Sequence, residues 1–402
     1  MSNVVYAWEL GADLGHIANF LPIALALKQQ GHAVTAVVRD LSRAATVFGD
    51  HGIPVLQAPV WLAQNAELPD PPLSFAEILQ RFGYADAIGL FGLVTAWQAL
   101  FDLLDPDLLV VDYAPTALLA VRGSGLPTAM FGTGFCSPPR ISPVPNMRPW
   151  QAVSQGRLEA SEAAVVATAN GVLAACAAPP LGALMDLFEV NCDFLATYAE
   201  LDHYRDRGAA EYWGPVLSPQ HDGKPRWPDE TGPRVFAYLK EGHPHFDAVL
   251  TRLAKRGCSV LVYAGRVSAA ARARHESPQI RFSPLPLDIR AVASECEVAV
   301  CHGGHGTTAA LLATGRPLLL LPMQLEQHLL GRNVTRLGAG VMVAPEATGT
   351  SLSESVDQLL DDQLLAAGAG AFARKYEDRT QQRIVESITV RCNQLLADQP
   401  IA

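Results

Sequence analysis

The sequence predicts an α/β protein with two doubly wound domains, each built on a parallel sheet that helices cover on both faces. The chain has 402 residues, and a single core stops growing at about 250–300 residues, so two domains of about 200 residues are expected. Short apolar runs alternate with helical patterns along the chain, as in βαβ units. The alternation pauses at 213–233, a stretch dense in Pro, Gly and charge, which is the predicted linker.

The strands expected in the first half are apolar throughout, which is typical of parallel strands buried on both faces. These strands lie at 4–8, 33–38, 108–111 and 128–131, with helices at 17–30 and 115–122. Two irregular, proline-rich segments interrupt this half, at 57–74 and 137–150. Loops of this length are often functional, and the alternative is that they are surface loops with no functional role.

The second half repeats the same alternation. Strands are expected at 235–239, 259–263, 298–301 and 317–321, helices at 245–256, 306–314 and 327–337, and a mostly helical end at 366–397. The predicted division is therefore an N-terminal domain at 1–212, the linker, a C-terminal domain at 234–375 and a final helical segment at 376–402.

Charge and cysteine usage exclude several classes of function. The net charge is −10 with scattered basic residues, which disfavours a nucleic-acid partner. The seven cysteines are odd in number and form no C-x-x-C pair, so neither a disulfide framework nor a zinc knuckle is expected. The start of the chain lacks a basic, apolar leader pattern, so no signal peptide is predicted and the cytoplasm is the expected location.

One apolar stretch, 88–104, comes nearest to a membrane span. It carries Gln98 and Asp102 and is slightly shorter than the ~20 residues that cross a bilayer. We therefore predict a buried helix and no stable membrane insertion.

The most informative stretch is the glycine-rich turn at 298–308, which reads VAVCHGGHGTT. A buried strand ends at Cys301, and Thr307 and Thr308 open a helix. The first N–H groups of a helix are unpaired and carry partial positive charge, and glycines let a ligand approach the backbone. Ligands bind at the carboxyl ends of strands in open α/β sheets, so an anion site is expected here.

Two other interpretations of this turn are open. It could be a tight strand-to-helix connection with Thr caps, or His302 and His305 could bind a metal, although no third ligand clusters with them. Neither the dinucleotide fingerprint G-x-G-x-x-G after the first strand nor a G-x-x-x-x-G-K-[ST] loop is present. This argues against an ordinary dehydrogenase or P-loop ATPase.

The turn is the first part of an ordered set of motifs. The set continues with Gly315-x-Pro317, Pro322-x-x-x-Glu326-Gln327, Asn333 and Leu337-Gly338-x-Gly340. It resembles the donor-binding signature of family-one glycosyltransferases, H-x-G-x-x-[ST], G-[VR]-P, P-x-x-x-[DE]-Q and N. The segments 282–304 and 212–217, and Gly15-His16 with the helix that follows, also resemble that family, so the match runs from about residue 4 to 343.

The resemblance implies a GT-B fold, in which two Rossmann-like domains face a central cleft. The C-terminal domain would hold a nucleotide sugar, the N-terminal domain an acceptor, and the final helix would cross back to the first domain. The family inverts the anomeric configuration without a metal or other cofactor. The expected partners are a UDP- or dTDP-sugar and a small, apolar natural product, while the sugar and the oligomeric state stay open.

Inverting transfer needs a base for the acceptor hydroxyl, and histidine suits this near pH 7. His16, between the first strand and first helix, matches the family's base, and Asp112, after the run 108–111, matches its partner. A helix-capping loop histidine is the alternative for His16. Asp105 and Asp107 are rivals for Asp112 that more naturally cap the strand entrance, and Asp13 is a rival that more naturally is a solvated loop carboxylate.

The resemblance also assigns the donor site. The diphosphate would contact His302, Gly303, Gly304, Gly306, Thr307 and Thr308, and the sugar hydroxyls Glu326 and Gln327. The alternative for that last pair is that they only stabilise the N-terminus of their helix, where a carboxylate is favourable without any ligand. The family's stacking Trp corresponds here to Phe282, and the Pro-Gln pair that begins two residues later corresponds to Pro284 and Leu285. The ribose-binding Glu corresponds to Ala310, so the choice of nucleobase stays open. Lys240 could meet a phosphate or be solvated.

The acceptor site is the least defined part. Its apolar candidates are Trp61, Phe91, Phe135 and Trp150, whereas Trp97, on a predicted helix, is expected in the core. Two kinds of rival function remain: another enzyme of the same fold, either a lipid-intermediate glycosyltransferase or a nucleotide-sugar epimerase, and a non-catalytic nucleotide-sugar-binding or partner-activating protein.

Overall fold

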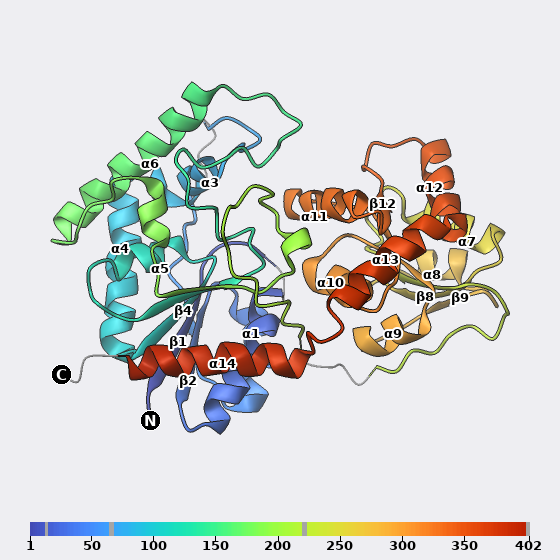
Figure 1. The fold of residues 1–402 in the computed structure, drawn as a ribbon, viewed down its shortest axis with the longest axis horizontal. Helices are drawn as coiled ribbons and strands as arrows, with labels where there is room; N and C mark the ends of the chain where they lie inside the picture. The colour runs from blue at the N-terminus through green and yellow to red at the C-terminus, as the bar shows by residue number, and fades with distance from the viewer. Residues whose placement is uncertain (13–14, 64–67, 219–222, 399–402) are drawn as a thin grey trace. The chain divides into compact units, whose positions relative to one another are not determined.

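The computed structural model describes residues 1–12, 15–63, 68–218 and 223–398. The chain divides into two compact units (Figure 1). Unit 1 comprises residues 1–197, 204–218 and 382–402, and unit 2 comprises residues 198–203 and 219–381. Each unit contains its own six-stranded sheet, and all strand pairs are parallel. The predicted fold class, α/β with two Rossmann-like doubly wound domains, is confirmed.

The sheet of unit 1 has the order β3-β2-β1-β4-β5-β6. Its strands are β1 (Asn3–Trp8), β2 (Ala33–Val38), β3 (Val55–Gln57), β4 (Leu108–Asp112), β5 (Thr128–Gly132) and β6 (Cys192–Leu195). Chain order reverses at β1 and β4, which lie side by side at the centre, and ligands of doubly wound sheets bind at this switch point. Every residue of β4 is buried, as its continuous apolar sequence predicts.

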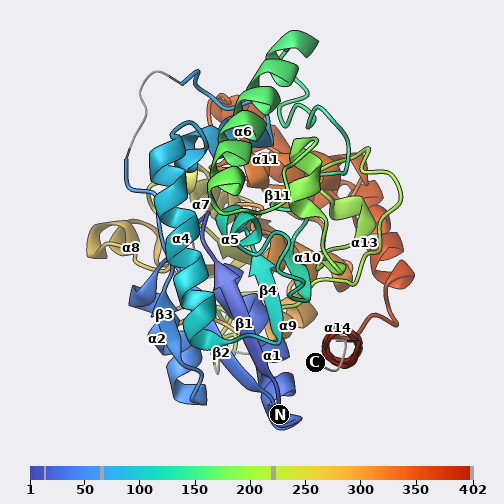
Figure 2. The same ribbon diagram turned by 90° about the vertical axis from the view of Figure 1, so that its left-hand side faces the viewer.

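Helices cover both faces of this sheet. They are α1 (Gly15–Gln29), α2 (Leu41–Phe48), α3 (Phe75–Leu79), α4 (Ala87–Leu104), α5 (Pro115–Ala120) and α6 (Gln155–Ala175), with short helices η1 (Gly49–His51), η2 (Gln80–Tyr84) and η3 (Leu184–Phe188). Helices α4, α5 and α6 pack on one face, and α1 and α2 pack together on the other (Figure 2). Asp40 begins α2 and Ser154 begins α6 by accepting backbone N–H groups, as N-caps do.

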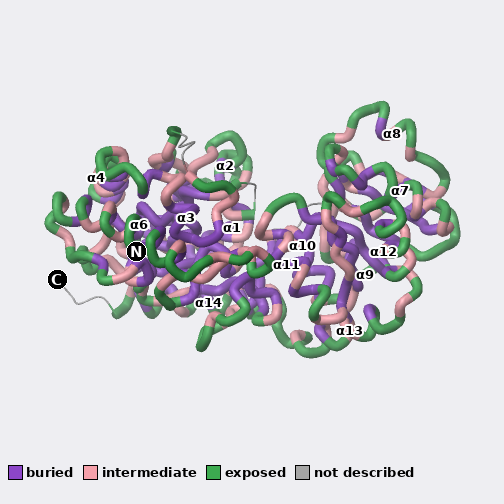
Figure 3. Tube along the Cα trace, turned by 90° about the horizontal axis from the view of Figure 1, so that it is seen from above, coloured by how far each residue is buried: buried purple, intermediate pink, exposed green. Residues whose placement is uncertain are grey.

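Helix α4 corrects the prediction of a buried helix at 88–104. Among the described residues it is the one helix long and apolar enough to cross a membrane, but only 28% of it is buried. Trp97 and three other residues face the core, whereas Ile88 is 87% exposed. Figure 3 shows that buried, intermediate and exposed residues alternate along α4. Its apolar residues extend right round the helix, so composition alone could not show that only one face packs.

The sheet of unit 2 has the order β12-β11-β10-β7-β8-β9. Its strands are β7 (Arg234–Tyr238), β8 (Ser259–Tyr263), β9 (Ile280–Phe282), β10 (Val298–Cys301), β11 (Leu318–Leu320) and β12 (Gly340–Met342). Its helices are η4 (Ala199–Leu201), α7 (Phe246–Lys255), α8 (Ala269–His275), α9 (Ile289–Glu295), α10 (His305–Ala313), α11 (Leu325–Arg336), α12 (Gly349–Asp361) and α13 (Gln363–Lys375). One apolar cluster lies under α7 and α12 and another under α10 and α13, so both faces of the sheet are buried.

The unit boundaries differ from the predicted ones. Residues 198–203 and 376–381 belong to unit 2, and the predicted linker 213–233 is divided, with 213–218 in unit 1 and the rest in unit 2. The first stretch is held in unit 2 by specific contacts: the Asn333 amide donates to the Asp202 carbonyl at 2.7 Å, and the Tyr376 hydroxyl donates to Glu200 at 2.5 Å. These long-range contacts have no local sequence signal.

The last helix, α14 (Gln381–Ala397), packs on unit 1. Its Ile384, Ile388 and Cys392 are buried. Gly214 has φ +93, and a Cβ there would lie 2.8 Å from Ile384, so glycine allows the helix to approach. The His32 ring also meets the Asn393 amide oxygen at 2.9 Å.

Candidate functional site

The carboxyl edge of the unit 1 sheet brings His16 and Asp112 together. Trp8, the last residue of β1, is in register with Asp112, the last residue of β4. His16 lies in the first turn of α1, just after the loop that leaves β1. The His16 Nδ1 and Asp112 Oδ1 atoms are 2.9 Å apart, and the two side chains are 18% and 3% exposed. The two side chains that the sequence paired therefore lie within hydrogen-bonding distance of each other.

This contact determines the chemistry that the histidine can do. An ionised carboxylate only accepts hydrogen bonds, so Nδ1 carries a proton, and in the neutral form of the ring Nε2 carries the lone pair. The Trp8 indole stacks on the imidazole with centroids 5.2 Å apart. A Cβ on Gly11 would lie 2.6 Å from Nε2, and Gly11 has φ +84, so only glycine fits against this nitrogen. The arrangement matches a base whose tautomer is set by a carboxylate.

Sequence reasoning missed Tyr6, which lies directly behind this pair. Its hydroxyl is 3.0 Å from Asp112 Oδ2 and 2.7 Å from the His16 carbonyl oxygen. Tyr6 is fully buried, and burial, reinforced by Asp112, raises its pKa well above the usual value. The available signal was strand alternation: Tyr6 precedes Trp8 by two residues, so both side chains lie on the same face of the sheet.

Sequence reasoning also missed Glu9, at the end of β1. Glu9 is 1% exposed, and its carboxylate accepts from the Thr116 N–H at 2.9 Å and from the Thr116 hydroxyl at 2.6 Å. Burial raises the pKa of Glu9 to about 7, although the Thr116 hydrogen bonds act in the opposite direction. The pair ties the end of β1 to the start of α5.

The carboxylates that rival Asp112 lie elsewhere. Asp107 accepts from the Asn3 N–H at 2.7 Å, at the amino edge of the sheet, and Asp105 ends α4 with φ +43. Both therefore belong to the entrance of β4, as the sequence suggested. Asp13 lies outside the described residues.

Of the four acceptor candidates, the structure links one to the dyad. Phe135 packs edge-on against Tyr113 at 6.4 Å, and the Tyr113 ring is 6.2 Å from that of His16. Trp61 is seated instead against Gly89, where a Cβ would lie 2.3 Å from its ring. Phe91 and Trp150 are 40% and 38% exposed on the surface of unit 1. Their predicted contact with an acceptor stays untested.

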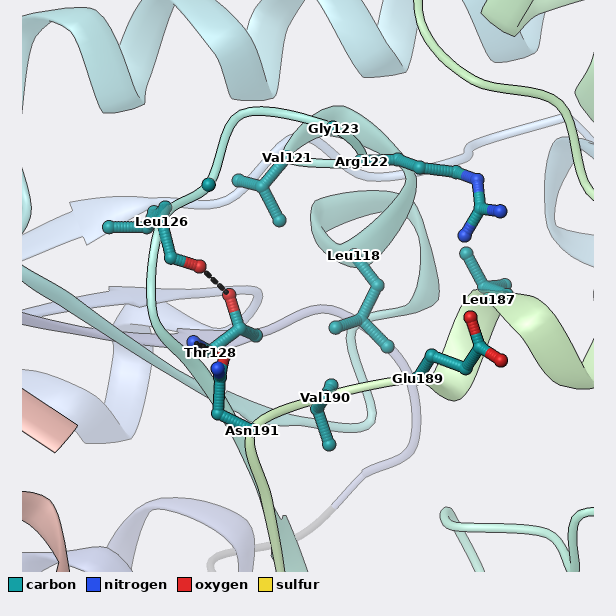
Figure 4. A pocket seen from close by; sticks show the side chains of 11 residues that line it. Leu118, Val121, Arg122, Gly123, Leu126, Thr128, Leu187, Glu189, Val190 and Asn191 are labelled. Atoms are coloured by element: carbon teal, nitrogen blue, oxygen red, sulfur yellow. Dashed lines mark hydrogen bonds between the residues drawn. The ribbon is translucent and has the colours of Figure 1, made fainter. Parts of the chain in front are cut away.

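A hollow in unit 1 lies at the opposite, amino edge of its sheet. Thr128 begins β5 and Asn191 precedes β6, and both line it, together with Leu118 and Leu126 (Figure 4). Arg122 also lines the hollow, and its guanidinium donates hydrogen bonds to the carbonyl oxygens of Pro179, Pro180 and Asp186. The hollow is therefore distinct from the dyad and offers no unpaired cation.

In unit 2, the glycine turn leads from β10 into α10, as predicted. Helix α10 begins at His305, and its first helical bond runs from the Thr308 N–H to the Gly304 carbonyl at 3.0 Å. The N–H groups of Gly306 and Thr307 therefore precede the helical ladder, and both residues are partly exposed. Gly303 has φ +82 and lies against the Gln327 carbonyl of α11, where a Cβ would approach to 3.1 Å.

His302 is engaged within unit 2 through both ring nitrogens. Its Nε2 accepts from the Lys240 N–H at 2.7 Å, and its Nδ1–H donates to the Leu321 carbonyl at 3.1 Å. Burial lowers its pKa, so the ring is neutral. In this arrangement His302 holds the β7 loop beside the turn, and a direct bond to a diphosphate would require the Lys240 contact to open.

Two predicted donor contacts need correction. Thr308 is fully buried on the inner side of α10, whereas Thr307 lies at the surface of the turn. Phe282 is 3% exposed within the apolar cluster under α7, and the Arg272 guanidinium lies 5.4 Å above its ring. Phe282 is therefore not a stacking surface for a base. Leu285, in the following loop, is 64% exposed, and Lys240 is also exposed.

The predicted sugar-binding pair opens α11. The Gln327 side-chain oxygen accepts from the Met323 N–H at 2.8 Å, which leaves its amide NH₂ to donate. The Glu326 carboxylate lies 3.8 Å from Nε2 of His203, a residue that sequence reasoning missed. His305, beside His203, is buried, and burial lowers its pKa to about 3, so it too is neutral.

No group of three or more His, Cys, Asp or Glu side chains able to hold a metal occurs in the part of the chain that the structure describes. Within those described residues, the alternative of a metal site at His302 and His305 has no third ligand. The ring nitrogens of His302 are already bonded to the backbone.

Comparison with known proteins gives a family match for part of unit 2 and a fold match for nearly the whole chain. Residues 258–389 match the family "Erythromycin biosynthesis protein CIII-like, C-terminal domain". The fold resembles the glycotransferase of kitacinnamycin, with a TM-score of 0.73 and 18% identity over 96% of this chain and 98% of that one. The chain thus has the GT-B fold, and the predicted resemblance to family-one glycosyltransferases is confirmed.

Particular relatives match over shorter stretches. A PGL/p-HBAD biosynthesis glycosyltransferase of Mycobacterium tuberculosis is 30% identical over 174 residues, which are 41% of this chain and 39% of that protein. The 3-alpha-mycarosylerythronolide B desosaminyl transferase of Saccharopolyspora erythraea is 30% identical over 112 residues, which are 28% of this chain and 26% of that protein. The match thus spans about two fifths or less of these relatives.

Two structures of the same fold contain ligands. The Streptomyces sp. SF2575 glycosyltransferase SsfS6 complexed with thymidine diphosphate has a TM-score of 0.64 at 19% identity, over 96% of this chain and 99% of that one. Spinosyn rhamnosyltransferase SpnG complexed with spinosyn aglycone also has a TM-score of 0.64, at 17% identity, over 96% of this chain and 100% of that one.

Proposed function

We propose that the protein is an inverting glycosyltransferase that moves a sugar from a UDP- or dTDP-sugar to a hydroxyl of a small, apolar natural product. Unit 1 binds the acceptor and supplies the base, His16, and unit 2 binds the donor. The observation that carries the proposal is the 2.9 Å contact between His16 Nδ1 and Asp112 Oδ1 at the switch point of the unit 1 sheet.

The reaction follows from that contact. His16 Nε2 takes the proton of the acceptor hydroxyl as its oxygen attacks the anomeric carbon. The bond from that carbon to the diphosphate oxygen breaks from the opposite side, so the configuration inverts and the nucleoside diphosphate leaves with the electron pair. The imidazolium that forms is stabilised by the Asp112 carboxylate.

Unit 2 offers the leaving diphosphate a backbone site. The N–H groups of Gly306 and Thr307 begin α10, where the helix dipole favours negative charge. Because His302 and His305 are neutral, partial backbone charges, with Lys240 nearby, carry this role. We propose that no metal is needed for turnover.

Glu326 and the Gln327 amide would hold the sugar hydroxyls. Both lie in the first turn of α11, and Gln327 packs directly against the glycine turn through Gly303. A carboxylate and an amide supply an acceptor and a donor, which sugar hydroxyls need.

The dyad also weighs against the rival functions. A non-catalytic binding protein has no need for a carboxylate-oriented histidine beside a glycine whose Cβ would obstruct it. An epimerase of this fold would act on the donor alone, so it would change the configuration of the donor sugar without any acceptor and without a glycosylated product.

The test is an acceptor-dependent release of nucleoside diphosphate. The full chain is incubated with UDP- and dTDP-sugars and a panel of phenols and macrocyclic alcohols, and products are identified by mass. We expect release and a glycosylated product only when donor and acceptor are both present. Release without acceptor, or no product with any pair while dTDP and UDP bind, would contradict the proposal.

A further inference from the structure

The hydroxyl of Tyr6 occupies a position that the dyad alone does not explain. It lies 3.0 Å from Asp112 Oδ2, while the other carboxylate oxygen, Oδ1, meets His16 Nδ1 at 2.9 Å. Asp112 is 2% exposed, so these two donors satisfy both oxygens of a carboxylate that water barely reaches. Together they fix the plane of the carboxylate.

The same hydroxyl also lies 2.7 Å from the backbone carbonyl of His16. A phenol has one proton and can share it between two acceptors on the same side. Tyr6 therefore links the carboxylate that orients the imidazole to the backbone that carries the imidazole.

The surroundings of Tyr6 hold its ring in place. The ring stacks on Phe20 of α1 at 4.2 Å and packs at a tilt on Phe48 of α2 at 6.4 Å. Its titratable neighbours are Asp112 from β4 and Cys136 from the segment after β5. Burial raises the Tyr6 pKa, so the hydroxyl keeps its proton and acts as a donor throughout the working pH range.

We propose that Tyr6 is a positioning residue for sugar transfer: by donating to Asp112 and to the His16 carbonyl, it holds the dyad in its active geometry and moderates the basicity of His16. The inference rests on the proposed function. Tyr6 does not touch the substrate, because it is fully buried behind Asp112. Its effect is exerted through the carboxylate.

The sign of the effect on basicity follows from the hydrogen bonds. A donor to the carboxylate spreads its negative charge and weakens its attraction for the imidazolium. Removing that donor raises the proton affinity of the coupled His16–Asp112 pair. The titration midpoint of the His16 ring, and with it the acid limb of the kcat profile, should then move to higher pH.

The test compares Tyr6→Phe with Tyr84→Phe, which removes an equally buried hydroxyl from the same unit. Phenylalanine keeps the ring stacked on Phe20, and thermal melting confirms that both variants fold. Tyr6→Phe should lower kcat roughly tenfold and leave the donor KM unchanged. Its acid limb should rise by about 0.5–1 pH unit, the equivalent of a hydrogen bond of about 1 kcal/mol.

A second readout needs no substrate. Nitrogen-15 NMR of histidine-labelled protein follows the His16 ring, whose signal is the one lost in His16→Ala. The midpoint should rise in Tyr6→Phe, stay at the wild-type value in Tyr84→Phe, and not change on adding Tyr6→Phe to Asp112→Asn, because the effect passes through the carboxylate.

Equal midpoints in wild type and Tyr6→Phe, with kcat within twofold of Tyr84→Phe, would overturn the positioning role. If wild-type protein transferred no sugar, the proposed function would fail, while the NMR midpoint would still decide whether Tyr6 acts on the dyad.

Discussion

The two sheets have the same strand order but use their carboxyl edges differently. In unit 1 the edge carries side chains that bond to one another: Tyr6, Asp112 and His16 form one chain, and Glu9 binds Thr116. In unit 2 the histidines at the edge are neutral, and His302 is bonded to backbone groups. What unit 2 offers a ligand is mainly the start of α10.

This difference fits a division of chemical work. A proton transfer needs a side chain whose basicity and direction are set, and the proposed base in unit 1 would have both set by a buried carboxylate that selects one histidine tautomer. A diphosphate needs N–H donors with partial positive charge, which a helix N-terminus provides without any ionised residue. Changes at the first edge should therefore alter the rate, and changes at the second should alter binding.

The largest expected effect is that of His16→Ala. Turnover of an aliphatic alcohol should fall by roughly 10²–10⁴, the usual contribution of a positioned base. Binding of UDP or dTDP should barely change, because the proposed donor residues belong to unit 2. Steady-state kinetics and nucleotide-induced thermal shifts measure the two quantities. Asp112→Asn should also slow transfer, since an amide can hold the ring but not stabilise its charge.

Substitution of one glycine at each edge should distinguish an effect on kcat from an effect on nucleotide binding. Gly11→Ala should lower kcat at least tenfold and destabilise the fold by about 1–3 kcal/mol, because its Cβ would lie 2.6 Å from His16 Nε2 at φ +84. Gly304→Ala should leave melting unchanged, since no atom lies within 4 Å of its Cβ. It should instead weaken nucleotide binding at the turn. Equal effects of both variants on kcat and on binding would remove the distinction.

A buried group at each edge should make the stability of the fold depend on pH, and the two dependences should have opposite signs. The folded pKa of Glu9 is raised from 4.5 to about 7, so the folded state binds more protons between these values and loses stability as pH rises through them. At 1.36 kcal/mol per unit this amounts to about 3 kcal/mol. Glu9→Gln should abolish that slope, as measured by urea unfolding from pH 5 to 8.

The folded pKa of His305 is lowered from 6.5 to about 3, so its contribution to stability is present above pH 6.5 and is lost progressively as pH falls from 6.5 to about 3. His305→Gln should flatten that acid limb and leave the Glu9 slope in place. A Glu9→Gln protein with the wild-type pH slope would show that another group is responsible.

The smallest expected effect is that of chelation. Because the proposed donor site uses helix N–H groups, EDTA should leave kcat unchanged, while millimolar UDP or dTDP should raise the melting temperature through selective binding to the folded state. Loss of turnover with EDTA, restored by magnesium or manganese, would count against the backbone site. An absence of any nucleotide-induced shift would count against the donor assignment itself.

The comparison also shows what a sequence can predict. The parallel sheets and the meeting of His16 with Asp112 could be predicted, because continuous apolar runs mark parallel strands and neighbouring strands end at one edge. The glycine-rich turn at 298–308 could also be predicted, because its signal lies within a few neighbouring residues. Tyr6 and Glu9 were missed because their partners are 106 and 107 residues away in the chain, and local pattern does not reveal such pairs.

Errors in the donor site have a similar origin. Thr308 and Phe282 occupy matching motif positions, but which side of α10 or β9 faces the core depends on packing. The boundary at 198–203 is set by contacts with α11 and α13 that span more than 130 residues. Local motifs therefore predicted the candidate site, and tertiary packing decided which of its residues are exposed.

The most direct test of the account is the size of the His16→Ala effect on two acceptors with the same donor. An aliphatic alcohol keeps its proton until a base removes it, whereas an acidic phenol loses its proton readily. The account predicts that kcat falls by roughly 10²–10⁴ for the alcohol and clearly less for the phenol. An equal loss for both acceptors, or near-normal turnover of the alcohol, would show that His16 is not the base.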